Sequence, residues 1–172
     1  MKNSHRSTKK LTVTAILMAM TIVMCSFSIP VPGGHMYLND IVIVTAAILL
    51  EPFYAFMVGG IGAFLGDVFF YPTPMFVSLA VHGLQAIVIS LFARKRSVKM
   101  SIIGTVIGWI ITFTGYTLGR AFIYGTPEYA ILKLPFQIMQ TFVGSTAALL
   151  LCWKAGIVKA YDRLIGDDTY RN

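Results

Sequence analysis

Long apolar stretches alternate with short polar segments along nearly the whole chain. Residues 11–29 carry no charge, residues 75–93 are interrupted only by His82 and Gln85, and residues 100–123 and 135–153 are similarly apolar. A helix needs about 20 mainly apolar residues to cross a bilayer, so each of these four stretches is long enough to span. The pattern predicts an all-α integral membrane protein.

The cations indicate the direction of each crossing. Twelve of the 14 Lys and Arg residues lie in three clusters, and Lys and Arg that flank a span are held on the cytoplasmic side of a membrane. All three clusters should therefore face the cytoplasm, and each segment joining two of them should cross the bilayer an even number of times. The clusters are Lys2, Arg6, Lys9 and Lys10; Arg94, Lys95, Arg96 and Lys99; and Lys154, Lys159, Arg163 and Arg171.

Residues 40–71 decide the number of spans. A single crossing there would place the second cluster outside, so we predict two helices with a cytoplasmic turn at Glu51-Pro52, because proline disfavours helix in the residue before it. Residues 1–172 then form one membrane domain of six transmembrane helices, with both the N- and C-termini cytoplasmic. The helices are expected at about 11–29, 40–50, 53–71, 75–93, 100–123 and 135–153.

The segment after the last span, 157–172, is expected to be an amphipathic tail. Its residues Ile157, Tyr161, Leu164 and Ile165 share one helical face. An apolar face of this kind favours a helix lying on the cytoplasmic membrane surface.

Composition agrees with a polytopic protein of a plasma membrane, which we expect to be bacterial. The chain has 56% hydrophobic and 12% charged residues, with a mean hydropathy of +0.74. Its net charge of +7 does not require a nucleic-acid partner, because the cations flank the spans and face lipid. Cys25 and Cys152 fall in opposite halves of the predicted membrane and lack metal-ligand spacing, so we expect neither a disulfide nor a metal site.

Polar side chains within the spans gather at one depth. With the directions assigned, nearly all of them lie in the outer half of the membrane, whereas the inner half is almost entirely apolar. Such groups cost several kcal/mol in lipid unless they face a partner, water or a ligand. We therefore predict an outward-opening pocket for a small polar, aromatic ligand. The candidate binding residues are His35, Asn39, Asp67, Tyr71, His82, Gln85, Tyr116, Arg120, Gln137 and Gln140.

Structural roles remain open for several of these residues. Asp67 and Arg120 could form an ion pair between helices, and His82 could bond Ser78 one turn earlier. Amide side chains commonly bond between membrane helices, and the loop residue His35 could simply be solvated. The loop at 30–39, with its two glycines, could close the pocket as a lid.

No catalytic or nucleotide-binding motif is present. The chain has no G-x-x-x-x-G-K-[ST] and no H-E-x-x-H, and nothing in the sequence orients Ser78 and His82 as a nucleophile and base. A binding pocket in a chain that has no energy source of its own implies a partner protein that supplies the energy. Ala15 and Ala19, one turn apart in the first helix, would let a partner helix approach closely.

These features resemble the S components of energy-coupling factor (ECF) vitamin transporters. The Ala15-x-x-x-Ala19 sequence matches the docking motif of that family. The segments Gly62-Ala63-Phe64-Leu65-Gly66-Asp67, Pro72-Thr73-Pro74 and Pro135-Phe136-Gln137-Ile138-Met139-Gln140 are similar to the subgroup that handles pyridoxine or hydroxymethylpyrimidine. The resemblance covers the whole chain and implies an S-component bundle that docks on a transmembrane T subunit driven by two ABC-type ATPase subunits.

The expected function is capture of a vitamin or vitamin precursor on the outside of the cell, with hydroxymethylpyrimidine or pyridoxine as the first choice. The chain would bind no cofactor and perform no catalysis, because its partners use the ATP. One alternative is a self-sufficient proton-coupled transporter that uses Asp67 as its proton carrier. Another is a membrane enzyme that uses Ser78 and His82.

Overall fold

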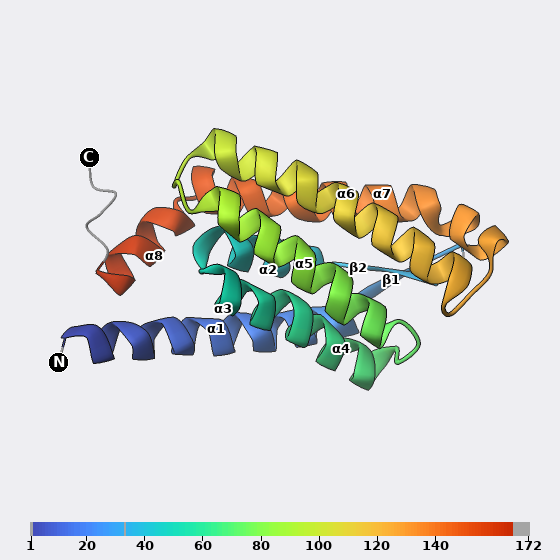
Figure 1. Ribbon diagram of the computed structural model, residues 1–172, viewed down its shortest axis with the longest axis horizontal. Coiled ribbons are helices and arrows are strands. Elements are labelled where there is room, and N and C mark those ends of the chain that lie inside the picture. Colours follow the sequence, from blue (N-terminus) through green and yellow to red (C-terminus); the bar gives the residue numbers. More distant parts are fainter. Residues whose placement is uncertain (1, 33, 167–172) are drawn as a thin grey trace.

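The computed structural model describes residues 2–32 and 34–166, and most of them are helical (Figure 1). A long first helix leads into a β-hairpin, and a short helix follows in the centre of the bundle. Helices α3 and α4 run on from one another through a π-helical turn, η1, and α7 ends in a second such turn, η2. The elements are α1 (Lys2–Ser26), β1 (Ser28–Val31), β2 (Gly34–Tyr37), α2 (Asn39–Leu49), α3 (Pro52–Phe56), η1 (Met57–Ile61), α4 (Gly62–Phe70), α5 (Met75–Ala93), α6 (Val98–Phe122), α7 (Pro127–Leu149), η2 (Leu150–Lys154) and α8 (Ile157–Ile165).

Five of the described helical segments are long and apolar enough to cross a membrane, which confirms the prediction of a helical multi-pass fold. They are Arg6–Ser26, Pro52–Phe70, Met75–Ala93, Val98–Phe122 and Pro127–Lys154. Helix α2 has only 11 residues, of which 10 are buried. At 1.5 Å per residue it is roughly 16 Å long, against about 30 Å of hydrocarbon. The sixth crossing therefore stays a prediction.

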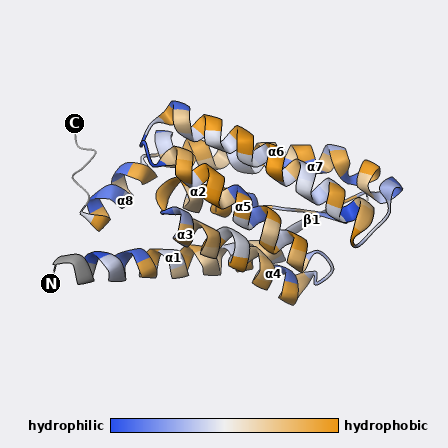
Figure 2. Cartoon of the chain, in the orientation of Figure 1, coloured by the Kyte–Doolittle hydropathy of each residue, from blue (hydrophilic) through white to orange (hydrophobic). Residues whose placement is uncertain are grey.

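The cation clusters meet at one end of the bundle. The start of α1, the turn between α5 and α6, and α8 all lie at the left of Figure 1, and Figure 2 shows hydrophilic residues gathered on the same three segments. This arrangement agrees with the even number of crossings inferred between clusters. The cytoplasmic location of this end, and of both termini, stays a prediction.

Three boundaries differ from the predicted ones. Helix α1 begins at Lys2 rather than at residue 11, and the predicted loop at 30–39 is largely a hairpin in which Ile29 pairs with Met36. Helix α7 begins at Pro127, so the predicted outer loop at 124–134 is mainly helix and Pro135 lies inside it. The predicted start at Pro135 is therefore wrong, and the proline lies two turns inside the helix, where its missing N–H leaves out one backbone hydrogen bond.

The N-terminus of α7 has its own start signal. The Thr126 side chain accepts a hydrogen bond from the Tyr129 N–H at 3.3 Å, Pro127 occupies the first turn, and Glu128 follows it. A hydroxyl cap, a first-turn proline and an early acidic residue are each favoured at a helix N-terminus. This combination placed the helix start eight residues before Pro135.

The cation end is held together by Arg96, in the turn between α5 and α6. Its guanidinium donates to the carbonyls of Ile48 (2.8 Å) and Leu49 (3.1 Å) at the end of α2, and pairs with Asp162 of α8 at 2.9 Å. The last carbonyls of a helix have no partner within it, so a cation there is stabilising. Arg96 thus ties α2 and α8 to the same turn.

Helix α8 packs against the bundle by a face that includes Tyr161 and Ile165, two of the residues predicted to face the membrane surface. Val158, Tyr161 and Ile165 are buried against the core that surrounds α2, whereas Leu164 is 48% exposed. The predicted set included Leu164 and omitted Val158, because helix geometry alone did not show which side the bundle would cover. Contact of the tail with the membrane surface stays a prediction, and residues 167–172 lie outside the described part of the chain.

Glycine allows a close contact between the π-helical turn η1 and α5. A Cβ at Gly59, in the π-helical turn, would lie 2.8 Å from the Cβ of Ala86 and 2.9 Å from the carbonyl oxygen of His82. Both neighbours belong to the body of α5, and one is backbone, so neither can rotate away. The crossing of this turn with α5 therefore requires glycine.

We predict that Gly59→Ala lowers the free energy of unfolding by about 1–3 kcal/mol through overpacking. Gly62→Ala is the matched control, because a Cβ there would meet Thr21 only at 3.3 Å. Thermal unfolding of the detergent-purified variants provides the measurement. Equal melting temperatures for the two variants would contradict the prediction.

Candidate substrate-binding site

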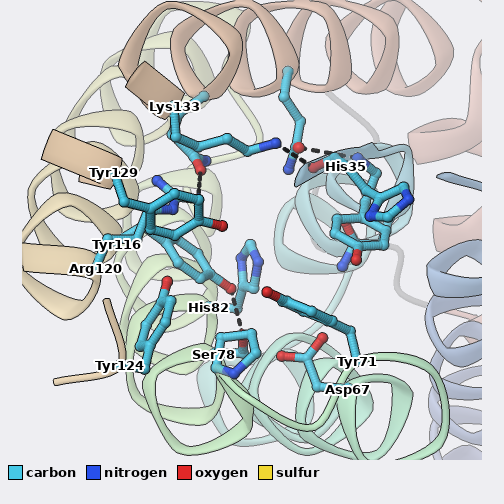
Figure 3. A pocket seen from close by; sticks show the side chains of 15 residues that line it. His35, Asp67, Tyr71, Ser78, His82, Tyr116, Arg120, Tyr124, Tyr129 and Lys133 are labelled. Carbon is cyan, nitrogen blue, oxygen red and sulfur yellow. Dashed lines mark hydrogen bonds between the residues drawn. The ribbon is translucent and has the colours of Figure 1, made fainter. Parts of the chain in front are cut away.

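A polar pocket lies at the end of the bundle opposite the cation clusters. Its cavity volume is about 50 Å³, or about 520 Å³ of empty space when the part open to solvent is included, and it receives side chains from the hairpin, α2, α4, α5, α6 and α7. Figure 3 shows His82 near the middle, with Asp67 and Tyr71 on one side and Tyr116, Tyr124 and Tyr129 on the other. The lining residues are His35, Tyr37, Asn39, Asp67, Tyr71, Pro74, Ser78, His82, Tyr116, Arg120, Tyr124, Tyr129, Lys133, Gln137 and Gln140.

The structure brings together nine of the ten candidate residues from the sequence. Gln85 is the exception, because it is fully buried one turn below His82 and does not line the pocket. It contacts the pocket indirectly, through its Oε1, which lies 2.7 Å from His82 Nδ1. Whether these residues bind a ligand stays a prediction.

The structure contradicts two of the alternative roles considered for these residues. Arg120 donates to Gln137 Oε1 at 2.6 Å, and no ion pair joins it to Asp67 within the described residues. Ser78 Oγ lies 2.6 Å from the Tyr116 hydroxyl instead of bonding His82. Arg120 and Ser78 each contact a side chain of another helix, because side chains of five helices converge at this depth.

Tyr116 forms the inner wall of the pocket. Its ring is 5.3 Å from the His82 ring in an edge-on arrangement, and the Arg120 guanidinium lies 5.3 Å over its centre. A cation over an aromatic face and an edge-to-face ring pair are both attractive. The Tyr116 ring is therefore held from two sides.

Several buried polar atoms around the pocket have no hydrogen-bond partner in the described part of the chain. Among the residues that line it they are two acceptors, Asn39 Oδ1 and Asp67 Oδ2, and one donor, Arg120 Nη1. Leaving such an atom unpaired costs about 1–3 kcal/mol, and more when it is charged. A ligand that offers both a donor and an acceptor would satisfy them.

The hairpin is fastened over the pocket by α7. Lys133 Nζ donates to the His35 carbonyl at 2.5 Å, and the Tyr37 N–H donates to Gln140 Oε1 at 2.9 Å. Both bonds reach backbone groups of β2, so they hold the strand itself rather than one side chain. The loop predicted as a lid is thus a hairpin with two specific attachments, and its role in closure stays a hypothesis.

Sequence reasoning identified Gln137 and Gln140 on the polar face of α7 but missed Lys133. Lys133, Gln137 and Gln140 follow each other at helical spacing and line the pocket together. This spacing could have revealed Lys133, but the residue was assigned to a loop because the helix was started at Pro135. Tyr37, Tyr124 and Tyr129 were missed in the same region, and burial raises the pKa of Tyr124 to about 12, so its hydroxyl remains protonated and can donate.

Comparison with known proteins identifies the kind of subunit to which this pocket belongs. A model of the family described as ECF-type riboflavin transporter, S component, matches residues 5–157. The chain belongs to this family. The match confirms the resemblance inferred from the sequence, and it places this S component in the plasma membrane as a transporter subunit rather than an enzyme.

Individual relatives agree with the family assignment. The thiamine precursor transporter HmpT of Lactococcus lactis subsp. cremoris is 32% identical over 152 residues, covering 86% of this S component and 87% of that protein. An uncharacterised protein of Pyrococcus woesei is 30% identical over 129 residues, covering 73% and 86%. A solved structure of the S component of a bacterial ECF transporter has a TM-score of 0.74 at 20% identity, with 88% and 97% covered, which shows a shared fold.

We predict that Lys133→Met loosens the hairpin, because it removes the cation that holds the His35 carbonyl. Amide hydrogen exchange across residues 28–37 should become faster, while exchange in α5 should stay unchanged. Lys95→Met, at an exposed position in the turn between α5 and α6, is the matched control. Unchanged exchange in the hairpin of Lys133→Met would show that the attachment does not restrain it.

Proposed function

We propose that this S component captures a small nitrogen heterocycle, with hydroxymethylpyrimidine as the first choice and pyridoxine as the second. The observation that carries the proposal is the set of unpaired polar atoms at the pocket: the acceptors Asp67 Oδ2 and Asn39 Oδ1 and the donor Arg120 Nη1. An aminopyrimidine has ring nitrogens that accept and an amino group that donates, so one ligand can satisfy both kinds of atom.

Ring recognition would come from the tyrosines. Five of them line the pocket, and aromatic side chains contribute large apolar contact while their hydroxyls remain available for hydrogen bonds. His82, Gln137 and Gln140 would add polar contacts from α5 and α7, whereas Gln85 would act through His82. The relationship to a protein named as a thiamine precursor transporter supports the same class of ligand.

Riboflavin is a further candidate, because the matching family is described as a riboflavin transporter. It has a three-ring system and a polyhydroxyl chain, and so needs a longer cavity than a single pyrimidine. The pocket here is ringed by side chains of the hairpin and five helices, which favours the smaller ligand. Direct binding decides between the two.

Energy for transport would come from partner subunits. Ala15 and Ala19 lie exposed on α1, beside the exposed apolar side chains Ile16 and Met20. Small residues one turn apart let a second helix approach closely in a membrane. We assign this face to docking on a transmembrane T subunit, which two ATPase subunits would drive.

Calorimetry of the detergent-purified chain with a vitamin panel tests the capture role. We expect tight, saturable binding of hydroxymethylpyrimidine without partners or nucleotide, and a loss of about 10- to 100-fold for Asp67→Asn, which removes a charged acceptor. Glu51→Gln, the same change at the other end of the bundle, should bind normally. Tight binding of riboflavin, without binding of hydroxymethylpyrimidine, would show that riboflavin is the ligand instead. No binding by a folded chain would favour the proton-coupled alternative.

A second prediction concerns the docking face. Ala15→Leu with Ala19→Leu should prevent assembly with the T subunit, because added side chains keep the partner helix away, while ligand affinity stays within about twofold. Co-purification of the T subunit, with calorimetry on the same sample, measures both. Normal assembly of the double variant would move the docking site elsewhere.

A further inference from the structure

Asp40 is a buried carboxylate beneath the pocket, and it does not line the pocket itself. It sits in the first turn of α2 and is fully buried. Its Oδ2 accepts a hydrogen bond from Gln140 Nε2 at 3.2 Å, and its Oδ1 lies 3.8 Å from His82 Nδ1. Gly144 of α7 leaves room for it, because a Cβ there would lie 2.6 Å from the Asp40 Cβ.

A carboxylate in this position is costly to bury. Taking an ionisable group out of water costs several kcal/mol unless it is paired and hydrogen-bonded, and one oxygen of Asp40 has no hydrogen bond within the described residues. Hydrophobic packing would join α2 to α7 at lower cost. The two residues that Asp40 approaches, His82 and Gln140, both line the pocket.

The surroundings of His82 determine which ring nitrogen carries its hydrogen. Two oxygens converge on Nδ1: Gln85 Oε1 at 2.7 Å and Asp40 Oδ1 at 3.8 Å. A lone pair on Nδ1 would face both of them, so the hydrogen belongs there. In a neutral imidazole the other nitrogen, Nε2, then carries a lone pair. Among the described residues no protein group bonds Nε2, and His82 lines the pocket.

We propose that Asp40 is a positioning residue that sets the hydrogen-bonding character of the pocket. Together with Gln85 it keeps the His82 hydrogen on Nδ1, so that Nε2 remains an acceptor for the substrate. Through Gln140 it also orients the amide whose oxygen holds the Tyr37 N–H of the hairpin. This inference rests on the proposed capture of a nitrogen heterocycle and specifies which group of the substrate is selected.

The expected selectivity follows from the balance of donors and acceptors. His82 Nε2 would join Asp67 Oδ2 and Asn39 Oδ1 as acceptors, against one unpaired donor on Arg120. A substrate with an N–H donor beside a ring-nitrogen acceptor is therefore favoured. An analogue with hydrogen in place of the amino group leaves a buried acceptor unpaired, and we expect it to bind about 10- to 100-fold more weakly.

Nitrogen-15 NMR of histidine-labelled protein tests the inference without any ligand. The chain has three histidines, and the His82 signals are those that disappear in His82→Gln. We expect chemical shifts of a neutral ring with its hydrogen on Nδ1. A hydrogen on Nε2 alone, or on both nitrogens, would overturn the proposal, and this measurement needs no folded variant of Asp40.

Asp40→Asn separates positioning from packing. The asparagine oxygen can still accept from Gln140, and its amide nitrogen then faces His82 Nδ1, which favours a lone pair there and moves the hydrogen to Nε2. Rotation of the Gln85 side-chain amide by half a turn exchanges its oxygen and nitrogen, and so accommodates a lone pair on Nδ1. We expect the shifted tautomer, together with loss of the preference for the amino-bearing ligand. Glu51→Gln is the matched control and should change neither.

The outcomes distinguish this inference from the proposed function. An unchanged His82 tautomer in folded Asp40→Asn, with only a lower melting temperature, would reduce Asp40 to a structural role. If the wild-type tautomer is as expected but no aminopyrimidine binds, the proposed cargo fails while the positioning role stands. If the amino-bearing ligand binds and Asp40→Asn keeps its selectivity, the proposal is wrong although the cargo is right.

Discussion

Polar groups in a bilayer must find partners within the protein, and the end of this S component opposite the cation clusters is organised by that requirement. Water cannot satisfy a carboxylate or an amide in hydrocarbon, so such residues persist only where other polar groups or a ligand meet them. Here the side chains of four long helices, the short α2 and the hairpin meet at one depth. Most of them pair with one another, and the few unpaired atoms mark where a ligand would contribute.

The same requirement explains why α2 can be short. Its 11 residues are enclosed by α1, α5 and α7, so its ends do not have to reach water unaided. Asp40 at its start is paired within the pocket region, and its final carbonyls are taken by Arg96 from the turn between α5 and α6. A helix too short to span by itself is thus completed by polar groups from neighbouring elements.

Sequence patterns predicted the features that depend on long runs of residues. The apolar stretches located the five long spans, and depth counting placed nine of ten candidate side chains in one pocket, because rise per residue is nearly constant in helices. The same patterns did not predict local exceptions. Pro135 lies within a helix, so the predicted loop wrongly included Lys133. Asp40 opens the predicted helix at 40–50 and was not among the candidates, because its contacts, Gln140 and His82, lie far from it in the sequence. Pairings such as Ser78 with Tyr116 depend on how helices pack, which no single sequence pattern reveals.

The hairpin has a further consequence, for the kinetics of ligand entry. Its strands satisfy much of their backbone hydrogen bonding with each other, so the hairpin could detach as a unit without unpairing them. Detachment would break the bonds from Lys133 and to Gln140, together worth roughly 2–4 kcal/mol, before the apolar contacts of Met36 are counted. An energy gap of that size corresponds to a detached population of about a few per cent or less at equilibrium. Under the lid hypothesis, the rate constant of ligand association is the diffusion-limited value multiplied by that fraction, and a bound ligand that also contacts the hairpin has a longer residence time.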